Sequence, residues 1–432
     1  MDITHYLNNE YSDSALYMSY RAIPSYIDGL KNSHRKIAYT LRKKNIKNEL
    51  KVYQLASQVA MESNYIHGDT SLQGAIVTLA QDYTGANNLP FIKGEGNFGT
   101  RFLNEASAAR YISARPQSYF DNIFKKEDDI NLISQNFEGD EIEPRFYVPT
   151  LPLILINGST GIGVGFSTKI LNRSVENMKK AILAKLDNKR ILSKWFIPSW
   201  NGFTGDVISL GDNKWDIRGT LTVNGRKAHI TELPIGCSLT EYFTVLKKLK
   251  EKGLITKFVD NSEMDRFDFE VTLSDEESKK PFEEIFNDLK LSVVVTENLT
   301  CIDENNAIRE FESIEELFNA YFNIKKDYLN KRLLSEIERL TQEASNLEEV
   351  HKFITEVIKG TLNLKKKKAE LEKDMTSKGY VNIDKLLSLP LSSLTVEKSL
   401  EIKKRWEDKV AELEEMKKKD FKILWEEDLK WL

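Results

Sequence analysis

The first quarter of the chain has apolar and basic positions spaced as in short amphipathic helices. Residues 28–44 place their apolar side chains on one helical face and most of their lysines and arginines on others. Residues 50–63 predict a second, more apolar helix. A third helix is expected at Asp69 and Thr70, which are good N-cap residues. Two short helices joined by a small loop at Gly68 predict a helix-turn-helix.

The pattern changes twice further along the chain. Residues 200–310 carry several short β-prone runs, interrupted by a helical pattern at 240–252, so this region is expected to be mixed α/β. Ser313 and Glu316 then form a capping-box pattern. Two heptad patterns flank a leucine-rich block at 386–394, which predicts an antiparallel coiled-coil arm with two helices of similar length and a globular tip. The seam positions are Leu333, Ile337, Leu340, Ala344 and Leu347, then Ile402, Trp406, Val410, Leu413 and Met416.

Composition narrows the class of protein. The 432 residues suffice for two to four domains, with 41% apolar and 30% charged residues. No run approaches the roughly 18 apolar residues of a membrane span, and the N-terminus has no signal-peptide pattern. The two cysteines, Cys237 and Cys301, form no CxxC pair. They argue against a disulfide scaffold or a zinc site and suit a reducing cytoplasm.

Charge is unevenly distributed although the net charge is only −4. Residues 21–51 carry nine lysines and arginines against two acids, and residues 121–147 carry eight acids against three bases. Such neighbouring blocks suggest two faces that meet different partners, or simply a solvated helix surface.

A glycine-rich stretch raises the question of a cofactor. Residues 94–99 read GEGNFG, a match to the G-x-G-x-x-G dinucleotide fingerprint, with Asp121 downstream. That fingerprint needs a βαβ unit with a buried strand before the first glycine, and only Leu-Pro-Phe-Ile precedes it. A glycine hairpin without chemistry is the plainer interpretation.

The pair Arg110-Tyr111 follows the glycines and offers another chemistry. A free tyrosine has a pKa near 10, so a nucleophilic tyrosine needs a neighbouring cation or a metal acting on its target. Attack on a phosphodiester also needs positive charge at the phosphate oxygens, which arginine supplies in bidentate form. Taken alone, such a pair is usually structural.

Four segments decide between these interpretations: YRAIPSYIDGLKNSHRK, YIHGDTSLQGAIVTLAQ, PFIKGEGNFGTRFLNEASAARY and LPLILINGSTGIGVGFSTKI. In order and spacing they resemble the breakage-reunion (gyrase A and topoisomerase IV type) subunit of type IIA DNA topoisomerases. Within that family the chain is most similar to the medium subunit of T-even-type phage enzymes. With the terminal arm, the resemblance covers nearly the whole chain.

The resemblance implies catalytic roles for four residues. Tyr111 matches the nucleophile that joins a DNA 5′-phosphate as a phosphotyrosine ester, and Arg110 matches the arginine that stabilises the transition state. Arg21 and His67 match positions near the cleaved phosphate. The family often has a second histidine one or two positions before His67, where this chain has Tyr65 and Ile66.

The resemblance also implies DNA-contacting residues. Ile162 matches a wedge that enters between base pairs, a device that bends DNA at a cost of a few kcal/mol per step. Thr70 lies where drug-binding sites of the family have a hydroxyl, but Gly74 lies where they often have an acid. The basic face of the first helix can track phosphates without reading sequence. Its expected contacts are Lys31, His34, Arg35 and Lys36.

Parts of the family's chemistry are not recognisable in this sequence. We find no convincing Glu plus Asp-x-Asp metal cluster and no Walker A motif. A large partner subunit is therefore expected to hold Mg²⁺ and to hydrolyse ATP. The chain also reaches Leu432 without the DNA-wrapping domain of gyrase, so relaxation and decatenation in phage DNA replication are expected rather than active supercoiling.

The resemblance implies a multidomain α+β architecture that works as a homodimer on double-stranded DNA, since cutting both strands needs two tyrosines. The dimer contacts are expected in the winged-helix domain and in the leucine block at the arm tip. The expected parts are an N-terminal arm (1–20), a winged-helix cleavage domain (21–120), an acidic connector (121–144), a mixed α/β tower (145–312) and a coiled-coil arm (313–432) with its tip near 380–395.

Two other functions compete with the topoisomerase. A non-enzymatic dimer that bends DNA would use the same basic helices, wedge and arm, and only the chemistry of Arg110 and Tyr111 separates it from an enzyme. An oxidoreductase would use the glycine fingerprint and would bind a nicotinamide cofactor.

Overall fold

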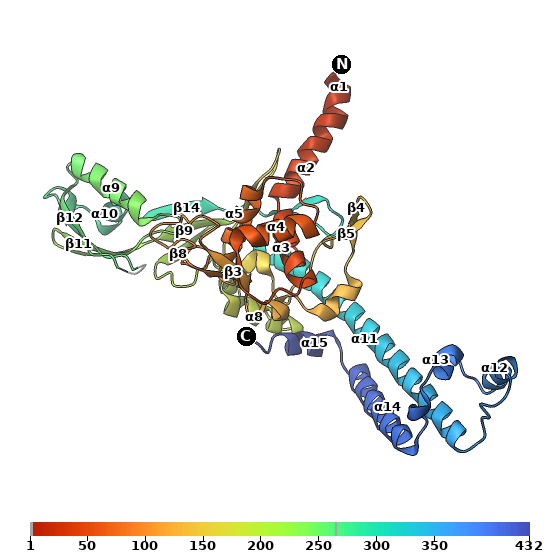
Figure 1. Ribbon diagram of the computed structural model, residues 1–432. Coiled ribbons are helices and arrows are strands. Elements are labelled where there is room, and N and C mark those ends of the chain that lie inside the picture. Colours follow the sequence, from red (N-terminus) through yellow and green to blue (C-terminus); the bar gives the residue numbers. More distant parts are fainter. Residues whose placement is uncertain (1–2, 264–265) are drawn as a thin grey trace. The chain divides into compact units, whose positions relative to one another are not determined.

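The computed structural model describes residues 3–263 and 266–432, which divide into two compact units (Figure 1). Unit 1 extends to Lys325 and includes Asp428–Leu432, and unit 2 is Lys326–Glu427. Helix α11 (Ile314–Ile358) begins in unit 1 and ends in unit 2. In the part of the chain that is described, no helix is long and apolar enough to cross a membrane.

Unit 1 begins with a helical segment and a three-helix group. The helices are α1 (Ile3–Tyr6), a π-helical turn (Leu7–Tyr11), α2 (Ser12–Ala22), α3 (Asn32–Lys43), α4 (Val52–Glu62) and α5 (Asp69–Ala80). The first two residues of the expected N-terminal arm lie outside the described residues. The apolar face of α3 is buried through Ile37, Ala38 and Leu41, as the periodicity predicts.

Two helix starts differ from the sequence expectation. Helix α3 begins only at Asn32, because the Asp28 carboxylate accepts a hydrogen bond from the Leu30 amide (2.9 Å) and holds this segment in a turn. The turn passes so close to a neighbouring helix that a Cβ on Gly29 would lie 2.5 Å from the Ile154 nitrogen. Helix α5 has Gly68 as its N-cap, without a side-chain cap, so Asp69 lies in the first turn instead.

The glycine-rich stretch forms an antiparallel sheet, with strand order β1–β3–β2. Its strands are β1 (Leu50–Lys51), β2 (Ile92–Glu95) and β3 (Ser113–Pro116). A Cβ on Gly94 would lie 2.5 Å from the Phe98 ring, and Gly99 has a φ of +94°. The glycines therefore serve this local packing. The antiparallel pairing excludes the βαβ unit that a dinucleotide fingerprint requires.

The rest of unit 1 is mixed α/β, as expected. Short elements lead into it: α6 (Phe120–Ile123), β4 (Gln135–Phe137), β5 (Asp140–Ile142), α7 (Leu153–Ile156), β6 (Ser159–Ile162), β7 (Ser167–Ile170) and α8 (Val175–Leu186). A three-stranded sheet has the order β14–β9–β8, and a four-stranded sheet has the order β10–β11–β13–β12. These strands are β8 (Asp206–Gly211), β9 (Lys214–Arg218), β10 (Thr220–Asn224), β11 (Lys227–Glu232), β12 (Ile255–Asp260), β13 (Phe269–Leu273) and β14 (Ser292–Thr296).

Helices α9 (Leu239–Glu251) and α10 (Phe282–Asp288) share one hydrophobic core with the four-stranded sheet. The hairpin of β15 (Thr300–Ile302) and β16 (Ile308–Glu310) precedes α11. At the start of α11 the Ser313 hydroxyl accepts a hydrogen bond from the Glu316 amide (3.2 Å), as the capping-box pattern predicts.

Unit 2 contains the rest of α11 and four further helices, α12 (Lys368–Ser377), α13 (Ile383–Leu387), α14 (Val396–Lys417) and α15 (Phe421–Asp428, whose last residue belongs to unit 1). Helices α11 and α14 run antiparallel, because Glu343 pairs with Lys409 (3.4 Å) while His351 contacts Ser399. Their lengths, 45 and 22 residues, are not similar as expected, because α12 and α13 occupy the chain between them.

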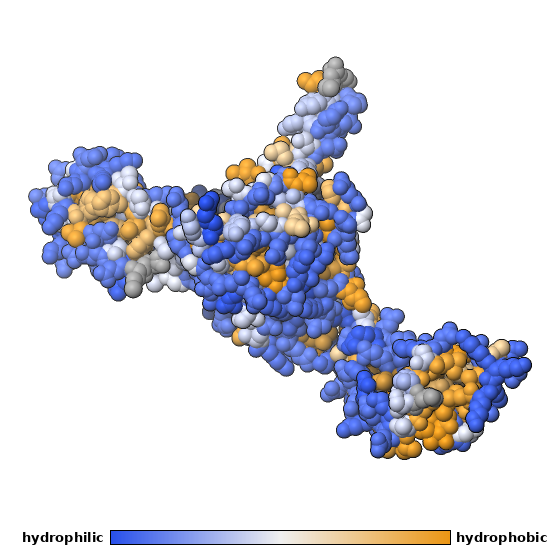
Figure 2. All heavy atoms as spheres, in the orientation of Figure 1, coloured by the Kyte–Doolittle hydropathy of each residue, from blue (hydrophilic) through white to orange (hydrophobic). Residues whose placement is uncertain are grey.

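The leucine-rich block packs within unit 2. Leu386 is buried in the core of unit 2, and Leu387, Leu389 and Leu394 pack against the same core. These side chains therefore contribute to the stability of the unit itself, and the role of the block in a dimer stays a prediction. Among the side chains that the structure describes here, Ile358, Val381, Val396 and Leu400 are exposed. Figure 2 shows apolar residues gathered on the viewed face of this end of unit 2.

Candidate functional site

Tyr111 lies on a tight turn immediately before strand β3. Its amide donates a hydrogen bond to the Ala108 carbonyl (2.8 Å), and the next residue, Ile112, is buried. The turn leaves the Tyr111 ring facing outward, where it is 72% exposed. The Lys51 ammonium donates to the Tyr111 carbonyl oxygen (3.3 Å). Arg110 is exposed beside it, with no hydrogen bond or ion pair to any residue that the structure describes.

His67 lies just before α5 and is packed against aromatic rings. Its Nε2 is 2.6 Å from the Tyr17 hydroxyl, and the Tyr65 ring meets it edge-on at 5.3 Å between centroids. Burial, then the positive charges of Arg21 and Lys36, lower the pKa of His67. The imidazole is therefore neutral at pH 7, and Arg21 is close enough to contribute to this effect. Thr70 is exposed in the first turn of α5.

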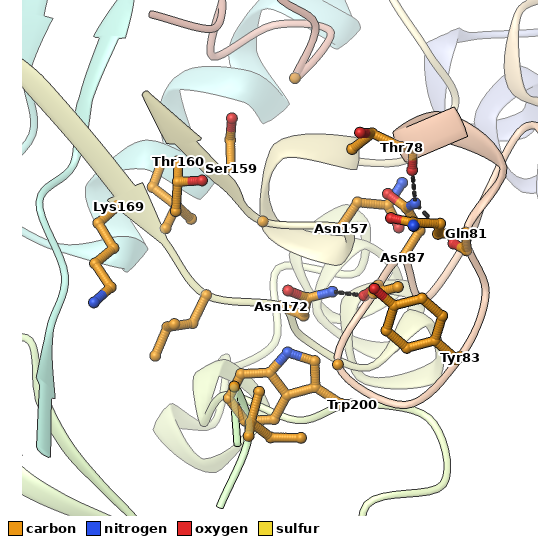
Figure 3. A pocket seen from close by; sticks show the side chains of 18 of the residues that line it. Thr78, Gln81, Tyr83, Asn87, Asn157, Ser159, Thr160, Lys169, Asn172 and Trp200 are labelled. Carbon is orange, nitrogen blue, oxygen red and sulfur yellow. Dashed lines mark hydrogen bonds between the residues drawn. The ribbon is translucent and has the colours of Figure 1, made fainter. Parts of the chain in front are cut away.

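Lys31 and His34 line a cavity of about 880 Å³. Figure 3 shows Ser159, Thr160 and Lys169 along one side of this cavity. The Lys31 ammonium donates to the Thr160 carbonyl (2.7 Å), which ties the start of α3 to strand β6. Burial, then the charges of Lys31 and Arg35, lower the pKa of His34 to about 3, so this imidazole is neutral at pH 7.

Ile162 is at the end of β6, in the β6–β7 hairpin, and is 87% exposed. A large apolar side chain this exposed has no packing role in the chain itself. The hairpin lies directly against α2, because a Cβ on Gly161 would be 2.1 Å from the Ala22 carbonyl oxygen. Beyond β7, Arg173 makes a fully buried ion pair with Glu297 (2.7 Å), which fixes the base of the hairpin.

For Arg35 and Lys36 the structure corrects the expected DNA contacts. The Arg35 guanidinium is buried and makes two hydrogen bonds to the Asp28 carboxylate, at 2.8 and 3.1 Å. The Lys36 ammonium is buried between the Glu143 carboxylate (2.9 Å) and the Ser63 carbonyl (2.5 Å). Because their donors are used inside the protein, neither side chain can reach a phosphate.

Part of the acidic block is exposed to solvent, and part of it is paired with the basic block. Arg42 pairs with Asp129 (2.5 Å), and Lys47 pairs with Asp121 (2.8 Å). Together with the buried pair of Lys36 and Glu143, these contacts join the basic block to the acidic one. Three of the nine cations of the basic block are paired in this way, so the two blocks neutralise each other only in part.

Comparison with known proteins places the chain in a family. A family model for the A subunits of DNA gyrase and topoisomerase IV matches residues 21–430. The chain belongs to this family. It is 32% identical to a mitochondrial DNA topoisomerase 2 of Dictyostelium discoideum, over 99% of the chain and 34% of that protein. It is 31% identical to DNA topoisomerase 2-alpha of Gallus gallus, over 95% of the chain and 29% of that protein. The chain thus spans about a third of the length of these curated relatives.

A solved structure supports the same placement. The DNA-binding, cleavage and re-ligation domain of Plasmodium falciparum topoisomerase II superposes with a TM-score of 0.86 at 30% identity. The match covers 98% of this chain and 63% of that one. The mixed α+β fold of the chain is therefore that of a topoisomerase II DNA-binding and cleavage domain.

The residues of this topoisomerase-family chain fall into two groups. Arg21, His67, Lys31 and the Ile162 hairpin are linked through α2 and the Lys31–Thr160 contact. In the described residues, no hydrogen bond, ion pair or ring contact joins the Tyr111 side chain to that group. Residues 3–263 and 266–432 also bring together no three His, Cys, Asp or Glu side chains that could hold a metal ion. The residues around Tyr111 therefore do not by themselves fit a Mg²⁺ site.

Two residues of the site carry no sequence motif. Lys51 begins the second predicted helix, and its place beside Tyr111 comes from the pairing of β1 with β3. Tyr17 precedes the first resembling segment and reaches His67, fifty residues later, through the docking of α2. The only local signal for Tyr17 is a helical segment unusually rich in tyrosine.

Proposed function

We propose that this chain is the DNA-breakage and rejoining part of an ATP-dependent type II DNA topoisomerase. In this proposal 21–120 is a winged-helix cleavage domain, 121–144 a connector, 145–312 a tower and 313–432 a coiled-coil arm. The observation that carries the proposal is an outward-facing Tyr111 beside Arg110, which has no partner among the described residues, in a chain of this family. A buried tyrosine at this position would favour an architectural protein that only bends DNA.

The proposed reaction is a phosphoryl transfer. The Tyr111 phenolic oxygen attacks a backbone phosphorus and the bond from phosphorus to the 3′-oxygen breaks. The phenol proton passes, by way of solvent or a base, to the released 3′-oxygen, which becomes a hydroxyl. One ester replaces another, so resealing by the reverse step needs no ATP. Arg110 and Arg21 balance the charge that develops on the phosphate oxygens, and His67, as a neutral imidazole, donates a hydrogen bond.

DNA binding is proposed to use the surface around α5 and the β6–β7 hairpin. Lys31 and His34, at the start of α3, would face the phosphates that flank the cut, with Thr70 at the start of α5. Ile162 would enter between base pairs and bend the duplex. Its high exposure, with no internal contact to lose, supports this role. Arg35 and Lys36 are left out because their donors are occupied.

The complete enzyme is proposed to contain further parts. Mg²⁺ and ATP hydrolysis would come from a partner large subunit, as in the phage type that the sequence resembles. Two copies of this chain would form the gate, through the winged-helix domain and the end of unit 2. There the exposed Val381, Val396 and Leu400 are candidates for the contact, together with the half-buried leucines of the block. Relaxation and decatenation in a reducing, cytoplasmic compartment complete the proposal.

The experiment that tests the proposal combines the chain with its partner subunit, Mg²⁺ and supercoiled DNA, and then denatures the mixture. Wild type is expected to leave protein covalently joined to 5′ ends of cut DNA. Tyr111→Phe should bind DNA with unchanged affinity and leave it intact. Covalent complexes that persist in Tyr111→Phe would refute the assignment of the nucleophile, and intact DNA with wild type would favour the DNA-bending alternative.

A further inference from the structure

We propose that Tyr17, on the N-terminal helix α2, is a positioning residue for His67, whose imidazole it holds in one orientation and one tautomer at the start of α5. The inference rests on the function proposed above, since that function places His67 beside a DNA phosphate. It makes the N-terminal helix part of the cleavage site instead of a connecting arm.

The geometry of the pair supports a directed contact. The Tyr17 hydroxyl lies 2.6 Å from His67 Nε2, and the two ring centroids are 5.9 Å apart. The Tyr65 ring contacts the imidazole edge-on at 5.3 Å. Two aromatic rings and one hydrogen bond therefore restrict the imidazole. Tyr17 belongs to helix α2 and is 50 residues from His67 in the sequence.

Helix α2 is itself held in place by contacts on other elements. The Tyr20 hydroxyl, one helical turn beyond Tyr17, donates to the Asn306 carbonyl (2.6 Å). Gly161 of the β6–β7 hairpin approaches the backbone of α2 too closely for any side chain, since a Cβ would lie 2.1 Å from the Ala22 carbonyl oxygen, and a Cβ on Gly163 would lie 2.9 Å from the Ser19 hydroxyl. A helix docked in this way can set the direction of the Tyr17 hydroxyl.

The charges around His67 keep it neutral, and its hydrogen bond then decides which nitrogen carries the proton. Arg21 of α2 and Lys36 of α3 are the charged groups that act on it, and Tyr17 and Tyr65 are the titratable side chains in contact. With burial, the two cations keep the imidazole neutral. A neutral imidazole has one donor and one acceptor nitrogen, so a Tyr17 hydroxyl that donates to Nε2 leaves the proton on Nδ1. The Nδ1–H is then the donor that remains for a phosphate oxygen.

The first arm of the test is spectroscopic and needs no activity. In the full chain labelled with ¹⁵N-histidine, His67→Gln identifies the ring signals of His67 by their loss. We expect the wild-type signals to show the proton on Nδ1 at pH 7 and Tyr17→Phe to shift them toward the Nε2–H form. Tyr20→Phe is the matched control, because it removes a hydrogen bond of equal length from the same helix without touching His67.

The second arm measures covalent cleavage by the complex with Mg²⁺ and the partner subunit. Tyr17→Phe is expected to lower the cleavage rate about three- to tenfold, the range of one lost hydrogen bond, with DNA affinity unchanged. In the His67→Gln background, Tyr17→Phe should have no further effect, because the two residues act as one unit.

Several outcomes overturn the inference. An equal loss of cleavage in Tyr20→Phe would show that only the docking of α2 matters. Unchanged His67 signals in Tyr17→Phe would show that the hydroxyl does not set the tautomer. If wild type forms no covalent complex, the proposed function fails, while the ¹⁵N signals still decide whether Tyr17 positions His67.

Discussion

The buried pair of Lys36 and Glu143 allows a sharp test of which basic residues serve the fold and which serve DNA. Replacing Lys36 by Met leaves a buried carboxylate without its cation, since the Lys36 and Glu143 side chains are only 9% and 1% exposed. Breaking such a pair costs about 3–5 kcal/mol, a large part of the roughly 5–15 kcal/mol that stabilises a domain. Lys36→Met combined with Glu143→Leu removes both charges and should recover most of this loss.

The pH dependence of the penalty follows from Glu143. Burial raises the pKa of this carboxyl, an effect that Lys36 opposes, so without Lys36 the pKa rises further. A carboxyl whose pKa is higher in the folded than in the unfolded state binds its proton more tightly when folded. The stability that this carboxyl contributes is fully present below the pKa of the unfolded state and is lost as pH rises through the pKa of the folded state. Lys36→Met should therefore be clearly less destabilised at pH 5 than at pH 8.

The assay is urea unfolding of the full chain at the two pH values, together with the salt dependence of DNA binding. Lys31→Met is the matched control, because Lys31 lies on the same segment, has no carboxylate partner among the described residues and donates only to the Thr160 carbonyl. We expect Lys31→Met to lower the slope of log affinity against log salt by about one and to leave stability nearly unchanged. A Lys36→Met variant of normal stability whose salt slope falls as in Lys31→Met would refute the assignment of Lys36 to the fold.

Two further predictions concern the hairpin and the cavity. Ile162→Ala should change the free energy of unfolding by less than about 0.5 kcal/mol but reduce DNA bending, measured by fluorescence energy transfer. Gly161→Ala should lower both stability and bending, because its Cβ would meet the Ala22 carbonyl. Equal stability of the two variants would contradict this contrast. His34 has a pKa of about 3 in the folded chain against about 6.5 unfolded, so its contribution to stability is present above pH 6.5 and falls by about 2 kcal/mol at pH 5. His34→Gln should flatten this loss in urea unfolding between pH 7 and pH 5, and an NMR titration of His34 near pH 6.5 would argue against it.

Elements with strong local signals are the ones that the sequence predicts well. The second helix, α9 and the start of α11 follow from periodicity and capping residues, and the chain breaks at Gly360 and Gly379, both with positive φ. The late start of α3 was missed because it depends on the Asp28 carboxylate and on close contact at Gly29. Strand β12 has no such local signal, because its sequence, ITKFVD, alternates poorly, and it gains its place from pairing with β13.

The residues of the candidate site likewise divide into those that the sequence predicts and those that depend on tertiary contacts. Motif order was enough to propose Tyr111, Arg110 and Ile162, because these roles depend on short segments. It could not separate Lys31 from Lys36, since both are lysines of one basic helix and Glu143, the partner of Lys36, is 107 residues away. A resemblance to a family shows which residue type is expected at a position. It does not show which other residues bond to that side chain, because tertiary packing determines those contacts.

The ion pairs of the basic block show which of its cations remain for DNA. Of the nine lysines and arginines between residues 21 and 51, six have a carboxylate partner within unit 1. The three without one among the described residues are Arg21, Lys31 and Lys51. Arg21 acts on His67, Lys31 bonds to the strand that ends in Ile162, and Lys51 bonds to the carbonyl of Tyr111. Arg35 and Lys36 are neutralised by buried carboxylates, whereas Lys43, Lys44 and Lys47 stay exposed beside theirs. The cations of this block that no described carboxylate holds therefore lie at three places that the proposed chemistry needs, where they can attract phosphate.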